Sequence, residues 1–217
     1  MRREKILKIF TKMPTLHTER LILRPMKTSD AYDMYEYSCR EDVTEYLLWS
    51  PHQSVGYTRE YLACVEAQYA KGEFYDWAIT LRDGGKMIGT VGFTKIHTSH
   101  NSAEIGYVLN PEYHHMGIGY EAAKRVLDFG FDILELHRAE ARFMQGNTAS
   151  EQLMKKLGMT FEGFGRDSML VKGSYRTIGT CSILRDEWTP SEHYTPNDVK
   201  RGNILNGIKD SIIKKFG

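Results

Sequence analysis

The chain has 217 residues, of which 41% are hydrophobic and 26% are charged, and its formal net charge is +1. This length and composition predict one soluble globular domain with a short appendage, and the balanced charge does not favour a nucleic-acid binder. The three cysteines, Cys39, Cys64 and Cys181, are far apart, as is typical of reduced thiols in a cytoplasmic protein. The sequence lacks the run of about 18 apolar residues that a membrane span needs, so we expect no membrane partner.

The N-terminal half predicts a strand, two helices and a hairpin. The segment "ERLILRP" alternates apolar and polar residues and stops at a proline, which is typical of a strand. One helix is expected to begin at Thr28 or Ser29, either of which can cap it, and a second to span Thr58 to Ala70. Two β-rich runs, 74–81 and 87–97, flank the turn "RDGGK" and predict a hairpin.

The C-terminal half alternates strands and helices. A strand is expected over 102–109, a helix after Gly119, a strand over 137–144, a helix over 147–158, and two or three closing strands over 159–184. This order predicts an α/β protein with a mixed sheet and helices on its faces.

The chain is expected to divide into an N-terminal extension, a domain and a tail. The expected boundaries are 1–14, 15–188 and 189–217. The tail begins with a proline-containing linker and continues into a basic amphipathic helix around Leu205 and Ile212. Such a helix can pack on its own domain, on a second copy or on a partner, so a monomer and a homodimer are both open.

The stretch from Asn110 to Ala123, "NPEYHHMGIGYEAA", places Gly117 and Gly119 at the start of a helix. Glycine costs helix stability there, but it lets another group come close to the backbone. The free N–H groups and the helix dipole together suit a phosphate or pyrophosphate. Tight helix–strand packing is one alternative. A dinucleotide fold is another, although it wants a third glycine where Ala122 stands and a motif nearer the N-terminus.

Several segments in order carry a family resemblance. They are "TERLILRP", "IGTVGF", "AEIGYVLNPEYHHMGIGYEA", "NTASEQLMKKLGMTFEG" and "LRDEW", all within residues 15–188. Together they resemble the GNAT acyltransferase superfamily, and more closely its branch of ribosomal-protein N-terminal acetyltransferases of the RimJ/RimL type. The resemblance implies a mostly antiparallel central sheet with a splayed parallel strand pair and helices on both faces. It also implies acetyl-CoA as co-substrate and no metal.

The resemblance assigns residues to the cofactor. The superfamily's pyrophosphate signature, Gln/Arg-x-x-Gly-x-Gly/Ala, reads here His114, His115, Met116, Gly117, Ile118 and Gly119, with Tyr120 following. The branch usually has Trp-Gly-Lys where this chain has His-His-Met, so a glycine and a lysine are missing from the turn. The backbone of Tyr107, Val108 and Leu109 is implied to pair with the pantetheine arm and to serve the oxyanion, and Asn147 to contact CoA. Metal binding by the two turn histidines with His97 and His100 has no supporting Cys or acidic spacing.

Acetyl transfer to an amine needs a neutral amine, a held oxyanion and a leaving thiolate that gains a proton. At pH 7 about one α-amine in ten is neutral, against fewer than about one lysine in a thousand, so a polypeptide N-terminus is the easier acceptor. Glu104 is the candidate base, with a solvent-facing or loop-holding role as the alternative. Ser150 is the candidate proton donor, because Met154 stands where much of the superfamily has a tyrosine; helix capping by Asn147 and Ser150 is compatible with that role.

The acceptor pocket is expected to contain aromatic side chains, for which the candidates are Tyr46, Trp49, Tyr69, Trp77 and Tyr175. We therefore expect an N-acetyltransferase that acts on a primary amine, most of all a protein or peptide α-amine. One alternative is a small amine such as a polyamine, amino acid or drug, for which an acidic rim of Glu41, Asp42 and Glu45 would speak. The other is a relic that binds acyl-CoA without turnover.

Overall fold

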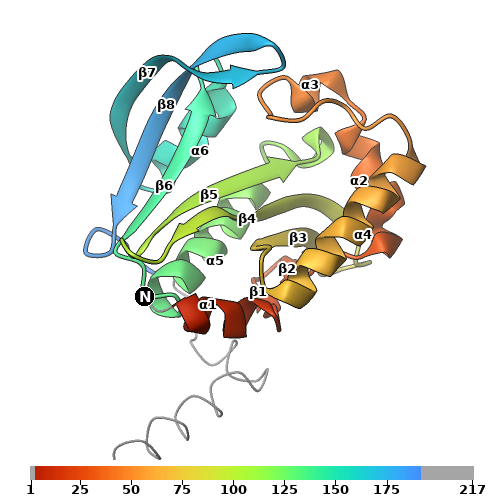
Figure 1. The fold of residues 1–217 in the computed structure, drawn as a ribbon, viewed down its shortest axis with the longest axis horizontal. Helices are drawn as coiled ribbons and strands as arrows, with labels where there is room; N and C mark the ends of the chain where they lie inside the picture. The colour runs from red at the N-terminus through yellow and green to blue at the C-terminus, as the bar shows by residue number, and fades with distance from the viewer. Residues whose placement is uncertain (1–2, 192–217) are drawn as a thin grey trace, which may run out of the picture.

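The computed structural model describes residues 3–191, which form one mixed sheet with helices on both faces (Figure 1). The elements in chain order are α1 (Arg3–Phe10), β1 (Leu16–His17), β2 (Leu21–Arg24), η1 (Thr28–Asp30), α2 (Ala31–Ser38), α3 (Glu41–Thr44), α4 (Val55–Lys71), β3 (Asp76–Leu81), β4 (Met87–His97), β5 (Ser102–Leu109), η2 (Pro111–Tyr113), α5 (Ile118–Asp132), β6 (Arg138–Met144), α6 (Thr148–Lys156), β7 (Thr160–Val171) and β8 (Ser174–Leu184).

The sheet has eight strands in the order β1-β2-β3-β4-β5-β6-β8-β7. Its neighbouring strands are antiparallel except for β5 and β6, which are parallel. The predicted α/β class and the mostly antiparallel sheet with one parallel pair are therefore confirmed. Within residues 3–191, no helix has the length and apolar character that crossing a bilayer requires.

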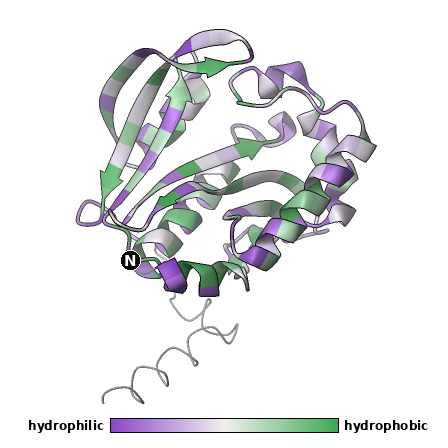
Figure 2. Ribbon diagram, viewed as in Figure 1, coloured by the Kyte–Doolittle hydropathy of each residue, from purple (hydrophilic) through white to green (hydrophobic). Residues whose placement is uncertain are grey.

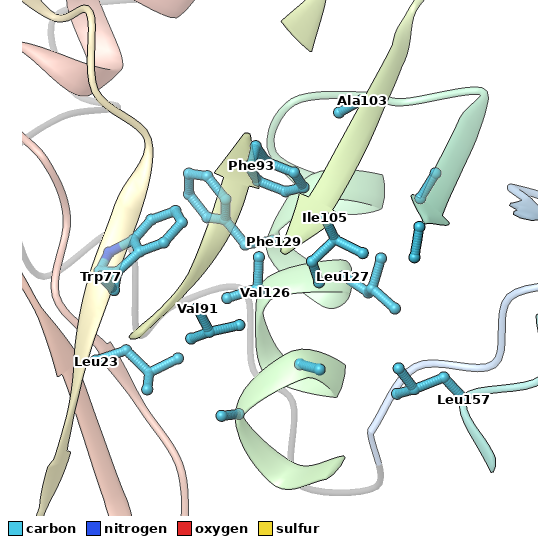
Figure 3. Close-up of a cluster of buried hydrophobic side chains, with 14 of the residues drawn as sticks. Leu23, Trp77, Val91, Phe93, Ala103, Ile105, Val126, Leu127, Phe129 and Leu157 are labelled. Atoms are coloured by element: carbon cyan, nitrogen blue, oxygen red, sulfur yellow. The ribbon is translucent and has the colours of Figure 1, made fainter. Parts of the chain in front are cut away.

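The main core lies between the sheet and α5. Trp77, Phe93 and Ile105 point from β3, β4 and β5 toward Leu127 and Phe129 of α5 (Figure 3). The rings of Trp77 and Phe129 meet edge to face with centroids 5.4 Å apart, a geometry that aromatic pairs favour. Figure 2 shows hydrophobic residues along these central strands, whereas hydrophilic residues recur along α4.

A second, smaller core lies on the opposite face of β3 and β4, beneath α2 and α4. Met34 of α2 and Leu62 and Val65 of α4 pack there against Ala78 and Met87 of the two strands. The helix expected from Thr58 begins earlier, at Val55, because Ser54 accepts a hydrogen bond from the Tyr57 N–H and caps it. It ends at Gly72, whose φ of 70° closes the helix in the left-handed region.

The N-terminal segment differs from the expectation of an extension at 1–14. Residues 3–10 form the amphipathic helix α1, and its Ile6, Ile9 and Phe10 are buried in the main core. The ring of Phe10 lies 4.7 Å from that of Tyr75. This segment therefore contributes to the packing of the domain. The short β1 and α3 were also not predicted, because two to four residues carry little periodic signal.

The chain leaves β8 along α5. Trp188 donates its indole N–H to the Asp128 carboxylate at 3.0 Å, and the Ser191 hydroxyl donates to the same carboxylate. These contacts hold the start of the expected linker against the domain. The expected C-terminal amphipathic helix, around Leu205 and Ile212, lies outside the described residues.

Candidate active site

The parallel strands β5 and β6 diverge, and their divergence opens the sheet. They pair only at Ser102, Ala103 and Glu104 of β5, which face residues 138–140 of β6. Beyond that point β5 continues to Leu109 along β4 alone, and β6 continues along β8 alone. Figure 1 shows the two strands together at one end and apart at the other. Among residues 3–191, the backbone groups of residues 105–109 that face β6 therefore have no strand partner, as the splayed pair predicted.

A turn that contains Gly117 follows β5, at the end of the strand where β5 and β6 are apart. Gly117 is the N-cap residue of α5 with a φ of 75°, and as a glycine it has no side chain with which to cap the helix. His115 also has a positive φ, of 60°. The first amides of α5 consequently keep their donors, and the helix dipole adds positive potential. A side chain on Gly117 would adopt a strained backbone and would approach Arg20. This arrangement fits the pyrophosphate of CoA.

Arg20 clamps this turn, a contact that the sequence analysis did not assign. Its Nη1 donates to the carbonyl of Met116 at 2.9 Å, and its Nε donates to Glu121 of α5 at 2.7 Å. Burial opposes ionisation of Glu121, but the hydrogen bonds from Thr18 and Arg20 outweigh it and hold the pKa of Glu121 below its ordinary value. A guanidinium group is thus fixed beside the candidate phosphate site. Its signal in the sequence was its place in "TERLILRP".

The remaining turn residues take different positions. The Nε2 of His114 lies 3.1 Å from the carbonyl of Leu109, so its ring reaches back to the end of β5. The Met116 side chain is exposed, whereas Ile118 is buried in the main core. The ring of Tyr120 lies 4.8 Å from the ammonium group of Lys156 on α6, which places a second cation near the turn. Because the Ile118 side chain is in the core, this residue can offer a ligand only its backbone.

A pair of hydroxyl groups joins β5 to α6 across the opening. The Oη of Tyr107 lies 3.0 Å from the Oγ of Ser150. Burial raises the pKa of Tyr107 to about 12, so the phenol keeps its proton at neutral pH and can donate it to Ser150. Asn147 caps α6 by accepting a hydrogen bond from the Ser150 N–H at 3.1 Å. Met154 lies in the core and cannot replace Ser150 as a polar group.

Glu104 lies where β5 and β6 part, but its carboxylate is not free. The Arg142 guanidinium on β6 forms an ion pair with it at 2.8 Å. This partner was not predicted from the sequence. It gives Glu104 a structural role like the loop-holding alternative, except that the segment it holds is strand β6. A role as base would require Glu104 to act while it remains bound to Arg142.

Of the five aromatic candidates for the acceptor pocket, two are buried in the main and smaller cores. Trp77 is fully buried on the α5 face and Tyr69 is buried in the smaller core, so their expected place in an acceptor pocket is corrected to a structural one. Tyr46 lies against Gly146. The ring of Trp49 lies 5.2 Å from that of His52. Tyr175, on the β7–β8 hairpin, is exposed.

One of the three expected acidic residues at the rim of the opening is paired with a cation. Asp42, one of the expected acidic residues, pairs with Arg40 at 2.7 Å, which offsets its negative charge. The ammonium group of Lys172 donates to the Thr44 carbonyl at 2.6 Å and so joins the β7–β8 turn to α3. Figure 1 shows these elements on either side of the wide end of the opening. Within residues 3–191, no cluster of three or more His, Cys, Asp or Glu residues is arranged to hold a metal ion.

Comparison with known proteins agrees with this geometry. The family model "Acetyltransferase (GNAT) domain" matches residues 20–160. The chain is 33% identical over 176 residues to an uncharacterised N-acetyltransferase, p20, of Bacillus licheniformis, which covers 81% of this chain and 99% of that protein. A GNAT-family acetyltransferase from Bacillus anthracis superimposes with a TM-score of 0.71 at 27% identity, covering 79% of this chain and 99% of the other.

Two further relatives have named acceptors. The spermidine N(1)-acetyltransferase of Escherichia coli is 25% identical, with 86% of this chain and 96% of that protein covered. The ribosomal protein uS5-alanine N-acetyltransferase of the same bacterium is 23% identical, with 81% and 93% covered. The second relative supports the RimJ/RimL-type resemblance found in the sequence. The chain belongs to the GNAT acetyltransferase family and is an N-acetyltransferase.

Proposed function

We propose that the protein transfers the acetyl group of acetyl-CoA to the α-amine of a protein or peptide. The observation that carries this proposal is the opening between β5 and β6, with an uncapped helix start at one end and a hydroxyl pair across it. An acetyl-CoA molecule supplies the thioester, whose cleavage drives transfer. The chain supplies the binding, the orientation and the proton transfers.

Different candidate residues bind different parts of acetyl-CoA. The backbone amides of residues 115–119 receive the pyrophosphate, with Arg20 and Lys156 adding positive charge nearby. The backbone of Tyr107, Val108 and Leu109 pairs with the pantetheine arm in place of the missing strand. One N–H there stabilises the oxyanion that develops on the acetyl oxygen. Asn147 lies at the start of α6, next to the hydroxyl pair.

Ser150 donates a proton to the departing thiolate. Its Oγ lies 3.0 Å from the Oη of Tyr107, and when the phenol donates this hydrogen bond the serine proton is free to point into the opening. Tyr107 remains protonated at neutral pH, so it keeps the proton with which it can donate. The intact hydroxyl pair speaks against a relic that binds acyl-CoA without turnover.

The acceptor is a primary amine, and an α-amine fits best. About one α-amine in ten is already neutral at pH 7, so the chemistry demands less of the site than a lysine or a polyamine does. The acidic rim that would attract a polyamine is partly neutralised by the Arg40–Asp42 pair. Relatives with either acceptor class exist, so a small amine is the second candidate.

Thermal unfolding with acetyl-CoA, free CoA and NAD tests the cofactor assignment. A ligand present at 100 times its dissociation constant adds about 2.7 kcal/mol of stability. We expect both CoA species to raise the melting temperature and NAD to leave it unchanged. A shift with NAD alone, or no shift with acetyl-CoA, would contradict the proposal.

An acetylation screen by mass spectrometry tests the acceptor. The substrates are peptides with a free N-terminus and no lysine, the same peptides blocked at the N-terminus with one lysine added, and spermidine. We expect the first group to be acetylated fastest. Faster acetylation of spermidine would establish the small-amine alternative, and binding of acetyl-CoA without any transfer would establish the relic.

A further inference from the structure

A carboxyl group that the proposed mechanism does not use lies on the α4 side of the sheet. Asp76 begins β3, and its register partner on β4 is Gly92, which in turn pairs with Gly106 on β5. The three residues form one row across neighbouring strands and face the same side. A Cβ on Gly92 would overlap the Oδ1 of Asp76, so the carboxyl group lies over that glycine.

One oxygen of the Asp76 carboxyl group is buried without a hydrogen-bond partner among residues 3–191. The residue is partly exposed, yet its Oδ1 is shielded from solvent and accepts no hydrogen bond within residues 3–191. The phenol of Tyr69 on α4 donates to the backbone carbonyl of Asp76, not to its side chain. Burial alone raises the pKa of Asp76 to about 7. A desolvated anion of this kind is costly unless something cationic binds it.

The groups around Asp76 do not supply that cation. On α4, Tyr61 has its pKa raised by burial to about 12 and Tyr69 has its pKa raised further, and on α2 burial also raises the pKa of Tyr37. All three phenols are therefore neutral at pH 7. Arg24, on the same face of the neighbouring β2, is held by the carboxylate of Asp30 through two hydrogen bonds of 2.7 Å.

The row also reaches the place where the sheet opens. Gly106 is two residues beyond Glu104, the last residue of β5 that pairs with β6. Neighbouring strands lie about 4.8 Å apart, so a group over Gly92 is one strand from the free edge of β5. A Cβ on Gly106 would lie 2.6 Å from the Cγ2 of Thr94, so the Thr94 side chain lies over this glycine. Above the two glycines therefore lie the Asp76 carboxyl group and the side chain of Thr94, an exposed residue.

We infer that Asp76 receives the ammonium group of the acceptor beside the open edge of β5 and removes one of its protons. This role rests on the acetyl transfer proposed above and names the residue that prepares its amine. The ammonium ion supplies the charge partner that the carboxylate lacks. Glu104, bound to Arg142, is then left to hold β5 and β6 together at the point where they part.

The protons and bonds balance. Asp76 takes one proton from R–NH₃⁺, and the neutral amine attacks the acetyl carbonyl carbon, so that the C–N bond forms and the C–S bond breaks. The thiolate takes a proton from Ser150, and the second amine proton restores the serine hydroxyl. Asp76 then releases its proton to solvent. The products are the acetylated amine, CoA–SH and one proton.

An α-ammonium group is the easiest acceptor for Asp76 to deprotonate. Its pKa, about 7.7–8.0, lies close to the pKa of about 7 of the carboxyl group. A lysine or polyamine ammonium group holds its proton more tightly, by more than about two units. This advantage of an α-amine comes from the amine itself, and the inference that Asp76 is the base is compatible with it.

The test compares Asp76→Asn with the wild type and with Asp83→Asn, a matched change in the exposed turn after β3. The probe is an N-terminal peptide that the wild type acetylates, assayed with saturating acetyl-CoA from pH 6.5 to 9. We expect kcat/KM for the peptide to fall about 100-fold at pH 7 in Asp76→Asn, within the range of lost general-base catalysis. The deficit should shrink toward pH 9, where the amine is neutral by itself. Asp83→Asn should stay within about twofold.

Asp76→Asn should retain its acetyl-CoA-dependent rise in melting temperature, which shows that the variant is folded and binds the cofactor. Asp76→Ala serves as a second variant, and added formate should restore part of its rate by replacing the carboxylate. An Asp76→Asn rate within about threefold of wild type, or a deficit that is the same from pH 6.5 to 9, would overturn the inference while the proposed function stands. If the wild type acetylates no amine, both the proposed function and this inference fail.

Discussion

Both faces of β3 and β4 carry a hydrophobic core, but the adjacent residues Asp76 and Trp77 place opposite chemistry on the two faces. Trp77 turns toward α5 and is fully buried among aromatic rings, whereas Asp76 turns toward α4 and has a carboxyl oxygen without a partner. On β4, Phe93 fills the core on the first face, and on the second face the Asp76 carboxyl group lies where Gly92 has no side chain. Alternation along a strand thus lets one segment build a stable core and a reactive surface together.

This contrast between Trp77 and Asp76 predicts that substitutions on the two faces have different effects. Substitution of Trp77 on the α5 face should cost stability whatever the pH, because it removes apolar burial. Substitution of Asp76 on the α4 face should alter catalysis and the pH dependence of stability, because it removes a desolvated carboxylate. Natural proteins retain such unfavourable groups where function requires them.

The largest effect is expected for Trp77→Ala. The change removes a fully buried indole and its hydrogen bond to the Pro14 carbonyl, so it should lower the free energy of unfolding by about 3–5 kcal/mol. Urea denaturation at pH 7 measures this, with Asp76→Ala on the opposite face as the comparison. A loss for Trp77→Ala no greater than that for Asp76→Ala would break the proposed contrast.

Next in size is the pH dependence caused by Asp76. Its pKa is raised from 3.8 to about 7 in the folded state, so the folded protein binds the proton more tightly than the unfolded chain. The resulting penalty is absent below about pH 4 and grows as the pH rises toward 7. Between pH 5 and 8 the wild type should lose roughly 2–3 kcal/mol relative to Asp76→Asn. If the free energy of unfolding changed with pH in the same way in both proteins, the Asp76 carboxyl group would not be desolvated.

Ser150→Ala should reduce kcat by about 100-fold, since the thiolate loses its proton donor. Tyr107→Phe should reduce kcat less, by about fivefold, because it removes one hydrogen bond that orients the serine. If the phenol acts through Ser150, the double variant should be no slower than Ser150→Ala. Independent, multiplying losses would assign the phenol a separate role.

A smaller effect is expected at the glycine turn. Arg20→Met removes the hydrogen bond to Met116 and the charge beside the turn, so it should weaken acetyl-CoA binding about tenfold, or about 1.4 kcal/mol. Calorimetric titration gives the dissociation constant, and Arg166→Gln on the exposed β7 is the matched control. An equal loss of acetyl-CoA affinity in Arg166→Gln would show that the effect comes from the overall charge of the protein.

The smallest effect is expected for Glu162→Gln. The Arg138 guanidinium, bound at 2.6 Å, and the Ser182 hydroxyl lower the pKa of Glu162 to about 2. The stability from this depressed pKa is present above about pH 4.5 and is lost as the pH falls through about 2. Since the carboxylate is partly exposed, the variant should lose less than about 1 kcal/mol at neutral pH. As the pH falls, the contribution of Glu162 to the free energy of unfolding should decrease, whereas the penalty caused by Asp76 should disappear. Contributions of the two residues that change in the same direction would contradict both assignments.

Much of the fold followed from the sequence because its signals are local. Apolar alternation and helical spacing located the main strands and helices, and Gly117 and Gly119 marked the helix start that now lacks a cap. The helix α1 was missed because its eight residues were read as part of a basic N-terminus. Trp77 and Tyr69 were misplaced because aromatic residues suit a core as well as a pocket.

The site was less predictable because its decisive contacts join distant segments. Arg20 meets Glu121, and Tyr107 meets Ser150, across separations that no local pattern encodes. Arg142 could not be paired with Glu104 before the register of β5 and β6 was known. The exposure and lack of partners of Asp76 likewise depend on which face of β3 the helices cover.

A crystal structure with bound acetyl-CoA tests the central claim most directly. We predict that the pyrophosphate contacts the amides of residues 115–119, that the pantetheine arm lies between β5 and β6, and that the acetyl group is reached from the α4 face near Gly106. An acetyl group that is accessible only from the α5 face, or a cofactor bound outside the β5–β6 opening, would contradict the account.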